Sequence, residues 1–388
     1  MSIFFKNRYV IFPLGKIAMY SFNLLPFVYF YERSNTKTTV LIPSHKFFSN
    51  RSKYGVINKP LLVIIKRSFD EKNIKYTENP LFIFLIFLLV KIKLIKIRGR
   101  SAALNDSEFY LKNNSLVSIM PQYTTCSDAF NRKKPFCNLS INENNNGIQV
   151  LHSNGIDPNK RIVTFHVRDS EYHPEQDLDF RDSSVDELIK ALEYLGSNGF
   201  NTFRMGSLQK TINTEIFPKG VVNYTDEFRT EFMDVYLIDK SDFFIGSTSG
   251  LWGIPYLFNT PQVNLNHIPF HDSTFGKNDI WLPKKLWLSK EKRFMSFNEI
   301  LSVPRIKMLT GDFYRDNHIE VIDNTSDEIL DAVIEMRNKI DGNLIYTEDD
   351  DYYWKKLKNM FSEDSPARYS SSRISKSFLY KYRKLLDY

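Results

Sequence analysis

Residues suited to chemistry gather in one stretch of the chain, from Arg161 to Arg181, which reads RIVTFHVRDSEYHPEQDLDFR. Residues 161–167 are largely apolar and β-branched, which predicts a buried strand of a parallel sheet. His166, Arg168 and Asp169 stand at the carboxyl end of that strand, where open α/β sheets bind their ligands. A guanidinium offers phosphate oxygens a rigid fork of donors, so we expect an anionic ligand such as a diphosphate. The alternative is that Arg168 only pairs with Asp169 or Asp182 and closes a loop.

A loop of glycines and hydroxyl residues, Gly246–Gly250 (GSTSG), follows a predicted strand at Asp242–Ile245 and precedes a predicted helix at Leu251–Phe258. Glycine lets the backbone approach a ligand, hydroxyls donate hydrogen bonds, and free amides at a helix start favour phosphate. The alternative is a small-residue turn that serves only its tight geometry. The residues expected to bind the anion are Ser247, Thr248, Ser249 and Gly250.

Two more arginines are predicted at the same edge of the sheet. Arg204 and Gly206 belong to the sequence RMGS, which ends a predicted strand at Asn201–Met205, and Arg181 closes the stretch described above. Because parallel strands end at one edge of a sheet, Arg168, Arg181 and Arg204 are predicted to converge on one crevice. Each arginine on its own could equally be a salt-bridge residue.

A general base must lie within hydrogen-bond reach of the attacking hydroxyl, and the candidates nearest the strand end are Asp169, Glu171 and His166. Tyr172 is the candidate for contact with the substrate whose hydroxyl attacks. Residues 177–179 read DLD and resemble a metal-binding DxD, but so short a pattern is common in an acidic loop and we predict no metal site. No Walker loop, GxSxG, zinc spacing or dinucleotide fingerprint occurs in a convincing context.

Strands and helices alternate from residue 161 to residue 340, which predicts a doubly wound parallel sheet. Two predicted helices carry start signals of the form S/T-x-x-E, one from Ser184 to Glu187 and one from Thr325 to Glu328. The further predicted elements are a helix at Arg229–Lys240 and strands at Gln262–Leu265 and Ile319–Ile322.

The chain is predicted to have three parts. Residues 1–150 form a first α/β domain, residues 160–345 form a second one, and residues 346–388 form a tail that packs back on the first domain. The alternative for the tail is that it lies on a membrane surface. The boundary lies in Asn138–Lys160, whose Asn, Gly and other polar residues predict loops. Strands of the first domain are predicted at Thr38–Pro43 and Leu61–Ile65.

The composition is that of a folded protein, with 42% hydrophobic and 25% charged residues. The formal net charge of +7 is unevenly placed, because residues 1–110 carry 18 Lys and Arg against 6 Asp and Glu. Such a region can meet nucleic acid, an acidic glycan or an anionic membrane, or it can be a solvated basic face. No nucleic-acid-binding motif is recognisable, so we expect no nucleic-acid partner.

Two apolar segments near the N-terminus bear on membrane contact. Tyr9–Tyr31 is aromatic but interrupted by a lysine, an asparagine and a proline, which predicts an interfacial docking element rather than a span. Leu81–Val90 is too short to cross a bilayer alone and is followed by KIKLIKIR, so we predict core followed by a basic face. The two cysteines, Cys126 and Cys137, fit free thiols in a reducing compartment.

Six blocks of the sequence resemble, in order, a family of bacterial glycosyltransferases associated with surface-polysaccharide assembly. The HVR segment also resembles the H-x-R element of fucosyltransferase-like enzymes with the GT-B fold. In the FRDSS block this chain has Asp182 where the family pattern leads us to expect Asn, and a carboxylate there weakens an anion site at Arg181. The blocks are HVRDSEY (166–172), FRDSSV (180–185), GFNTFRMG (199–206), DVYLIDKSDFFIGSTSG (234–250), PKKLW (283–287) and IEVIDNTSDEI (319–329).

The resemblance implies a GT-B-like α/β fold, in which two Rossmann-like doubly wound domains face a cleft. It implies inverting transfer of a sugar from a nucleotide-sugar donor, bound by the second domain, to a hydroxyl of a glycan or lipid-linked acceptor. By resemblance, Arg168 holds the donor's diphosphate with His166 beside it, and Ser247, Thr248 and Ser249 hold ribose or phosphate. No metal or other cofactor is implied, and the expected location is the cytoplasm, with peripheral contact at the inner membrane.

Two alternatives to a transferase remain at this point. A GT-B-like sugar-nucleotide epimerase would turn over without a second, acceptor substrate. A non-catalytic glycan-binding or scaffold protein of a polysaccharide assembly complex would show no turnover and would tolerate the substitution Arg168→Ala.

Overall fold

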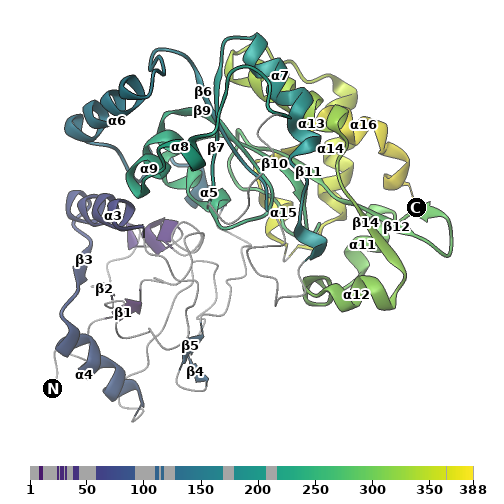
Figure 1. Cartoon of the computed structure of the whole chain (residues 1–388). Coiled ribbons are helices and arrows are strands. Elements are labelled where there is room, and N and C mark those ends of the chain that lie inside the picture. The colour runs from purple at the N-terminus through teal and green to yellow at the C-terminus, as the bar shows by residue number, and fades with distance from the viewer. Residues whose placement is uncertain are drawn as a thin grey trace.

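The computed structural model describes most of the chain from residue 127 onward and parts of the chain before it (Figure 1). The described residues are 8–11, 24–25, 27–29, 31–32, 38–42, 58–91, 110–112, 115–117, 127–168, 179–206, 216–363 and 365–387. Predictions that concern other residues, including Asp169, Glu171, Tyr172 and Cys126, lie outside these ranges.

A seven-stranded sheet organises the second part of the chain. Its strands are β6 (Ile162–His166), β7 (Asn201–Arg204), β8 (Val221–Val222), β9 (Ser241–Gly246), β10 (Gln262–His267), β11 (Ile280–Pro283) and β15 (Arg373–Ile374). The strand order is β15-β11-β10-β9-β6-β7-β8, and all neighbours run parallel. The chain runs outward from β6 to β8 and then returns to the other side of β6. The order therefore reverses between β6 and β9, which is where doubly wound sheets bind ligands.

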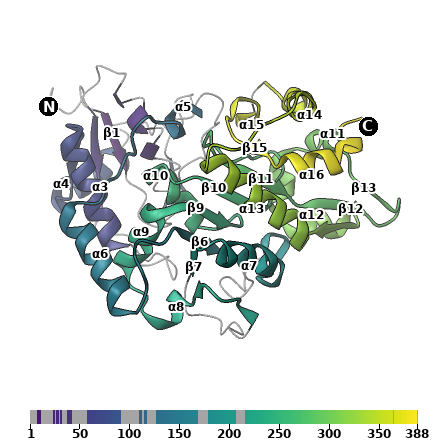
Figure 2. The same ribbon diagram turned by 90° about the horizontal axis from the view of Figure 1, so that it is seen from above.

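Helices cover both faces of this sheet, so the α/β doubly wound prediction is confirmed (Figure 2). Ile162 on β6 packs with the apolar side chains of α9 and α10, whereas Val163 and Phe165 pack with those of α7 and α13. Alternate residues of the strand thus point to opposite layers, as strand geometry requires. The helices concerned are α7 (Ile189–Ser197), α9 (Glu231–Lys240), α10 (Pro255–Phe258) and α13 (Ser326–Ile340).

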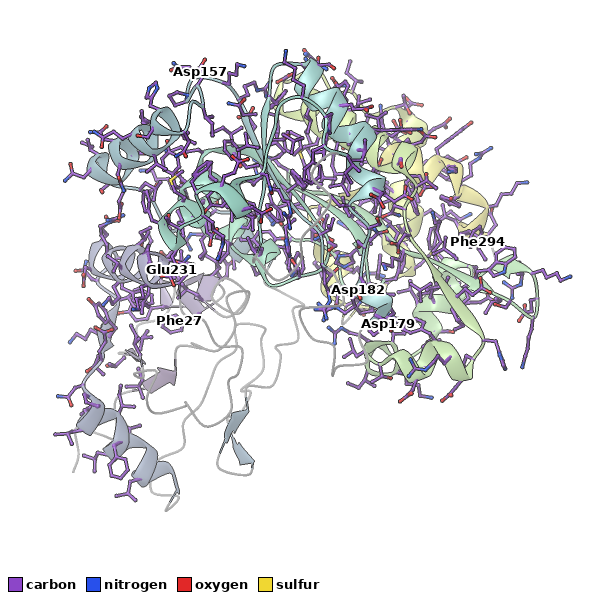
Figure 3. All side chains as sticks on the ribbon, in the orientation of Figure 1. Phe27, Asp157, Asp179, Asp182, Glu231 and Phe294 are labelled. Atoms are coloured by element: carbon purple, nitrogen blue, oxygen red, sulfur yellow. The ribbon has the colours of Figure 1, made fainter. Side chains whose placement is uncertain are left out.

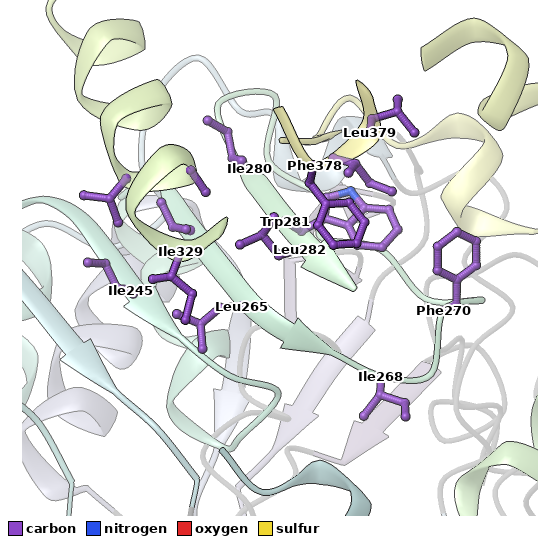
Figure 4. Packing of buried hydrophobic residues seen from close by; sticks show 14 of the residues in the cluster. Ile245, Leu265, Ile268, Phe270, Ile280, Trp281, Leu282, Ile329, Phe378 and Leu379 are labelled. Atoms are coloured by element: carbon purple, nitrogen blue, oxygen red, sulfur yellow. The ribbon is translucent and has the colours of Figure 1, made fainter. Parts of the chain in front are cut away.

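The C-terminal tail packs on this second part of the chain (Figure 4). It comprises α14 (Glu348–Met360), α15 (Pro366–Tyr369), β15 and α16 (Lys376–Lys381). β15 adds a parallel strand to β11, and Phe378 joins the core around the fully buried Trp281. The apolar residues of the described tail therefore lie in the core of the second part of the chain, while Asn131, within the predicted first domain, donates to Ser371 of the tail at 3.4 Å. β15 pairs with the sheet edge, and the buried aromatic residues of the tail, Trp354 on α14 and Phe378 on α16, join the same core.

A small antiparallel sheet lies beside the main one and consists of β13 (Arg293–Phe294), β12 (Lys285–Leu288) and β14 (Ile319–Ile322). The strand predicted at Ile319–Ile322 is confirmed, although it lies outside the parallel sheet. Asn324, just after β14, exchanges hydrogen bonds with Asn266, each backbone N–H donating to the other's side-chain oxygen at 2.6 Å. The segment after β14 is thereby fixed at the carboxyl end of β10. Helices α11 (Phe297–Ser302) and α12 (Gly311–Asp316) connect β13 to β14.

The predicted loop at Asn138–Lys160 is wrong, because α6 (Ile141–Ser153) occupies most of it. Ser140 accepts a hydrogen bond from the backbone of Glu143, and the Glu143 carboxylate accepts one from the backbone of Ser140. This capping box satisfies the first amides of the helix, which offsets the low helix propensity of the asparagines.

The predicted strand at Leu61–Ile65 is also wrong, because these residues lie in α3 (Lys59–Glu71). The side chain of Asn58 caps the helix by accepting from the N–H of Leu61 at 2.8 Å, and Pro60 stands in the first turn. Asn58 also donates to the backbone of Glu231 on α9, so α3 is docked on the second part of the chain.

Of the two predicted capping boxes, only the second forms. Thr325 and Glu328 cap α13 reciprocally. Ser184 instead accepts from the N–H of Asp186, while the carboxylate of Glu187 accepts from the hydroxyl of Ser326 on α13. The helix predicted after Ser184 therefore begins as a 3-10 turn and continues as α7.

The first part of the chain contains a three-stranded parallel sheet of β1 (Arg8–Ile11), β2 (Thr38–Leu41) and β3 (Lys75–Thr77), which confirms the strand predicted at Thr38. Its other described elements are α4 (Pro80–Lys91), β4 (Tyr110–Lys112), β5 (Ser115–Val117) and α5 (Ser127–Phe130). Within the described ranges no helix is long and apolar enough to cross a membrane. Cys137 is a buried free thiol, and burial raises its pKa to about 12.

Candidate functional site

The carboxyl ends of β6 and β9 are joined by direct hydrogen bonds. The backbone N–H of Arg168 donates to the hydroxyl of Ser247 at 2.9 Å, and the N–H of Ser247 donates to the carbonyl of His166 at 3.2 Å. Ser247 has no exposed surface. These bonds bring the HVR segment and the GSTSG loop together at the point where the strand order reverses, as the sequence predicted.

Arg168 is held at this junction by the turn that contains the FRDSS block. Its Nε donates to the carboxylate of Asp182 at 3.2 Å, and its carbonyl accepts from the N–H of Ser183 at 3.0 Å. The pairing of Arg168 with Asp182, considered above as the purely structural alternative, is therefore present. Figure 3 shows Asp182 at the opposite end of the sheet from Asp157, which precedes β6.

Arg181 is the second cation at this junction, and its charge is offset only in part by the nearby carboxylates of Asp182 and Asp272 among the described residues. Its Nη2 donates to the carbonyl of Thr248 at 2.9 Å, while its Nε is buried without a hydrogen-bond partner in the described structure. Burial, followed by repulsion from Arg168, lowers the pKa of Arg181 to about 10. No carboxylate of the described residues forms a salt bridge with it. Two guanidinium groups that repel each other would both be stabilised by an anion bound between them.

Three hydroxyls beside the two arginines are buried without a hydrogen-bond partner among the described residues, and they belong to Ser183, Thr248 and Ser249. Buried hydroxyls are normally satisfied, so these donors are suited to a ligand or to water. The helix predicted at Leu251–Phe258 is broken into a 3-10 turn, Leu251–Gly253, and the four-residue α10. Gly250 precedes that turn, and a long helix with a strong dipole does not follow the loop.

His166 and Gly206 pack together at the ends of β6 and β7. The Nδ1 of His166 lies 3.1 Å from the carbonyl oxygen of Met205, and a Cβ added to Gly206 would lie 3.1 Å from the same nitrogen. A carbonyl only accepts hydrogen bonds, so this contact requires a proton on Nδ1, and whenever the ring is neutral its lone pair is on Nε2. A side chain at position 206 would crowd His166, and a φ of +136° is rarely adopted by residues other than glycine. Both features favour glycine at this position.

Arg204 differs from the other two arginines in the contacts that it makes. Its Nη1 donates to the side chains of Asn223 at 3.0 Å and Asp226 at 3.3 Å, in and just before α8 (Tyr224–Glu227). Arg168 and Arg181 bond to the GSTSG loop and its neighbours, whereas these bonds of Arg204 hold the segment after β8. A role of Arg204 in donor binding remains a prediction.

Two functional candidates that the sequence did not predict, Lys284 and Asp323, lie behind the FRDSS turn. Lys284, directly after β11, donates to the carbonyl of Asp182 at 2.5 Å and forms a salt bridge with Asp323 at 2.7 Å. Both residues belong to blocks of the family resemblance, PKKLW and IEVIDN, which was the available signal. Their contacts depend on how β14 is placed, which no local pattern encodes.

No cluster of three or more His, Cys, Asp or Glu residues suited to a metal ion occurs in the parts of the chain that the structure describes. Asp179, half of the DLD sequence, accepts from the N–H of Asp182 through its carbonyl. Asp169 and Tyr172, the candidate base and the candidate acceptor contact, lie outside the described residues.

No protein-family model matches the sequence, and no curated protein matches it. Solved structures with a similar arrangement include the glycosyl transferase family 9 protein of Veillonella parvula, at 10% identity over 86% of this chain and 97% of that chain, with a TM-score of 0.45. The ADP-heptose LPS heptosyltransferase II of Escherichia coli is 15% identical over 71% of this chain and 90% of its own, with a TM-score of 0.40.

A third similar structure is the UDP-GlcNAc 2-epimerase of Neisseria meningitidis bound to UDP-GlcNAc. It is 12% identical over 67% of this chain and 82% of its own chain, with a TM-score of 0.25. At TM-scores below 0.5, none of these similarities identifies an activity for the present chain.

Proposed function

We propose that this protein is a glycosyltransferase that binds the diphosphate of a nucleotide-sugar donor at the junction of β6 and β9. The observation that carries the proposal is the pair of Arg168 and Arg181, two guanidinium groups that repel each other. Arg181 forms no salt bridge with a described carboxylate, and the charges of Asp182 and Asp272 oppose the repulsion only in part. The buried hydroxyls of Thr248 and Ser249 have no hydrogen-bond partner among the described residues. This arrangement fits an anion with several oxygens, and the sequence blocks that resemble glycosyltransferases contain the same residues.

In the proposed reaction, an acceptor hydroxyl oxygen attacks the anomeric carbon of the donor sugar. The bond from that carbon to the diphosphate oxygen breaks, and the acceptor's proton passes to a base. Negative charge develops on the leaving diphosphate, where the guanidinium groups of Arg168 and Arg181 stabilise it. His166 is a candidate for the base because a neutral ring that donates from Nδ1 to Met205 has its lone pair on Nε2, and Asp169 remains the other candidate.

The finer features of the proposal follow the sequence resemblance. We propose inversion at the anomeric carbon, a glycan or lipid-linked acceptor of a surface polysaccharide, and charge neutralisation by arginines without a metal ion. The acceptor would enter from the basic first part of the chain, in which residues 1–110 carry 18 Lys and Arg against 6 Asp and Glu. Opposite charges on the protein and the acceptor would raise the rate of encounter.

A thermal-shift screen of the full chain against UDP, GDP, ADP and CMP, with the corresponding nucleosides as controls, tests the donor site. We expect one nucleotide to stabilise the protein by about 2.7 kcal/mol at 100 times its dissociation constant, and its nucleoside to do much less. Stabilisation by glycans alone would instead favour the scaffold alternative. Turnover of a sugar nucleotide without any acceptor would favour the epimerase.

Peripheral membrane contact is proposed for α4. Leu81, Phe84, Leu85 and Leu88 form one stripe at helical spacing and are 79%, 54%, 41% and 43% exposed, while Ile83 and Ile86 are buried. The sequence predicted that Leu81–Val90 belongs to the core, and among its described side chains only one face of the helix is buried. A short apolar face beside a cation-rich sequence is typical of helices that lie in a bilayer interface. Lys91, Lys93, Lys96 and Arg98 follow in the sequence.

Substituting glutamate for Leu85 and Leu88 together is expected to reduce co-sedimentation with vesicles that contain anionic phosphatidylglycerol. The introduced carboxylates oppose both the burial of the helix face and its attraction to the lipid charge. Ile306→Glu, at a site that is 71% exposed far along the chain, is the matched control and should leave binding unchanged. Equal binding of all three proteins would remove α4 from the proposal.

A further inference from the structure

Two adjacent lysines after β11 are both buried but serve different parts of the fold. The side chains of Lys284 and Lys285 are 3% and 4% exposed. Lys285 pairs with Glu328 on α13 at 2.8 Å, whereas Lys284 pairs with Asp323 at 2.7 Å. Successive side chains of an extended segment point to opposite sides, so one lysine faces the helix layer and the other faces the FRDSS turn.

Lys284 has a second acceptor that Lys285 lacks, the backbone carbonyl of Asp182 at 2.5 Å. Its own backbone N–H donates to the carbonyl of His267 at 3.1 Å, so the lysine is anchored to the end of β10. Burial lowers the pKa of Lys284, and the negative charge of Asp323 opposes this effect. A cation held so firmly fixes the carbonyl that it binds.

The turn that Lys284 holds carries the proposed anion site. The carboxylate of Asp182 accepts from Arg168, the N–H of Ser183 donates to the carbonyl of Arg168, and Arg181 precedes them. A displacement of the Asp182 carbonyl would therefore move both arginines. Recognition of a diphosphate depends on their mutual placement, and shifts near 1 Å are costly at such sites.

We infer that Lys284 is a positioning residue for diphosphate binding, acting through the carbonyl of Asp182 without touching the ligand. The inference rests on the proposed function and extends it from the groups that would contact the donor to the residue that sets their spacing. Asp323 serves as the counter-charge that allows this lysine to be buried.

The adjacent lysine provides the matched control. We expect Lys284→Met to weaken binding of the stabilising nucleoside diphosphate by about 10-fold or more, while affinity for the corresponding nucleoside stays within 2-fold. Lys285→Met also removes a buried lysine from an ion pair, yet it should leave both affinities within 2-fold. Dissociation constants from calorimetric titration of the full chain are the measurement. Loss of diphosphate and nucleoside binding together would indicate general disruption and overturn the inference.

A second pair of variants, Lys284→Arg and Lys285→Arg, keeps the positive charge and covers the case in which either methionine variant fails to fold. Because a planar guanidinium cannot reproduce the geometry of an ammonium, Lys284→Arg should weaken diphosphate binding several-fold and Lys285→Arg should not. If the wild type binds the diphosphate and neither variant of Lys284 weakens it, the inference fails while the proposed function stands. If the wild type binds no nucleoside diphosphate, both fail.

Discussion

Replacing Arg168 by alanine is expected to lower kcat/KM for sugar transfer by about 10²–10³-fold, the usual consequence of removing one preorganised donor from developing negative charge. The substitution removes the guanidinium from the junction of β6 and β9 and leaves the Asp182 carboxylate without this partner beside the proposed diphosphate site. Arg168→Lys keeps the charge but not the fork, so we expect an intermediate loss. Initial rates at varied donor concentration, with the acceptor saturating, are the measurement.

Arg161 provides the control, because it stands at the opposite end of the same strand. It forms salt bridges with Asp242 and Asp341, and neither residue belongs to the candidate site. Arg161→Ala should reduce thermal stability while leaving kcat/KM nearly unchanged. The double variant Arg168→Ala/Asp182→Asn should recover part of the lost activity, since it also removes the carboxylate. Equal activity of wild type and Arg168→Ala would contradict the proposed role and favour the scaffold alternative.

The parallel sheet could be predicted from sequence because its strands are short, apolar and bounded by turn residues. The signals at Arg161–Val167, Asn201–Met205 and Asp242–Ile245 depend only on local pattern, and all three strands form. The same rule fails at Leu61–Ile65, since a short apolar run fits a buried strand and a buried helix face equally well. The helix signals there, Asn58 and Pro60, lie outside the run itself.

The candidate site, like the fold, could be predicted from the sequence only in part. Arg168 and the GSTSG loop follow strands that are adjacent in the sheet, so the edge rule for parallel strands places them correctly. Arg204 also ends a strand next to β6, but the strand pattern does not predict its hydrogen bonds to Asn223 and Asp226. Lys284 could not be predicted as part of the site, because its partner Asp323 follows β14, a strand of a different sheet. Long-range contacts of this kind depend on tertiary placement rather than on spacing in the sequence.

The buried carboxylate of Glu328 is expected to be among the largest single contributors to stability. It accepts hydrogen bonds from Lys285 at 2.8 Å, Lys381 at 2.6 Å and Tyr382 at 2.6 Å, and so ties the C-terminal tail to α13. Burial alone would raise the pKa of Glu328, but these three donors lower it to about 2. Glu328→Gln leaves Lys285 buried without its counter-charge, which we expect to lower the free energy of unfolding by about 3–5 kcal/mol.

The same carboxylate should make stability depend on acid. Because the folded-state pKa of Glu328 is about 2 and its ordinary value is 4.5, its stabilising contribution is fully present above pH 4.5 and is lost as the pH falls towards 2. This difference corresponds to about 3 kcal/mol. Urea unfolding followed by tryptophan fluorescence between pH 7 and pH 3 should therefore show wild type and Glu328→Gln converging in acid. Glu291→Gln, which alters only an exposed pair with Arg293, should follow the wild type throughout. A gap between wild type and Glu328→Gln that stays constant with pH would mean that the carboxylate contributes packing and hydrogen bonds but no charge-dependent stability.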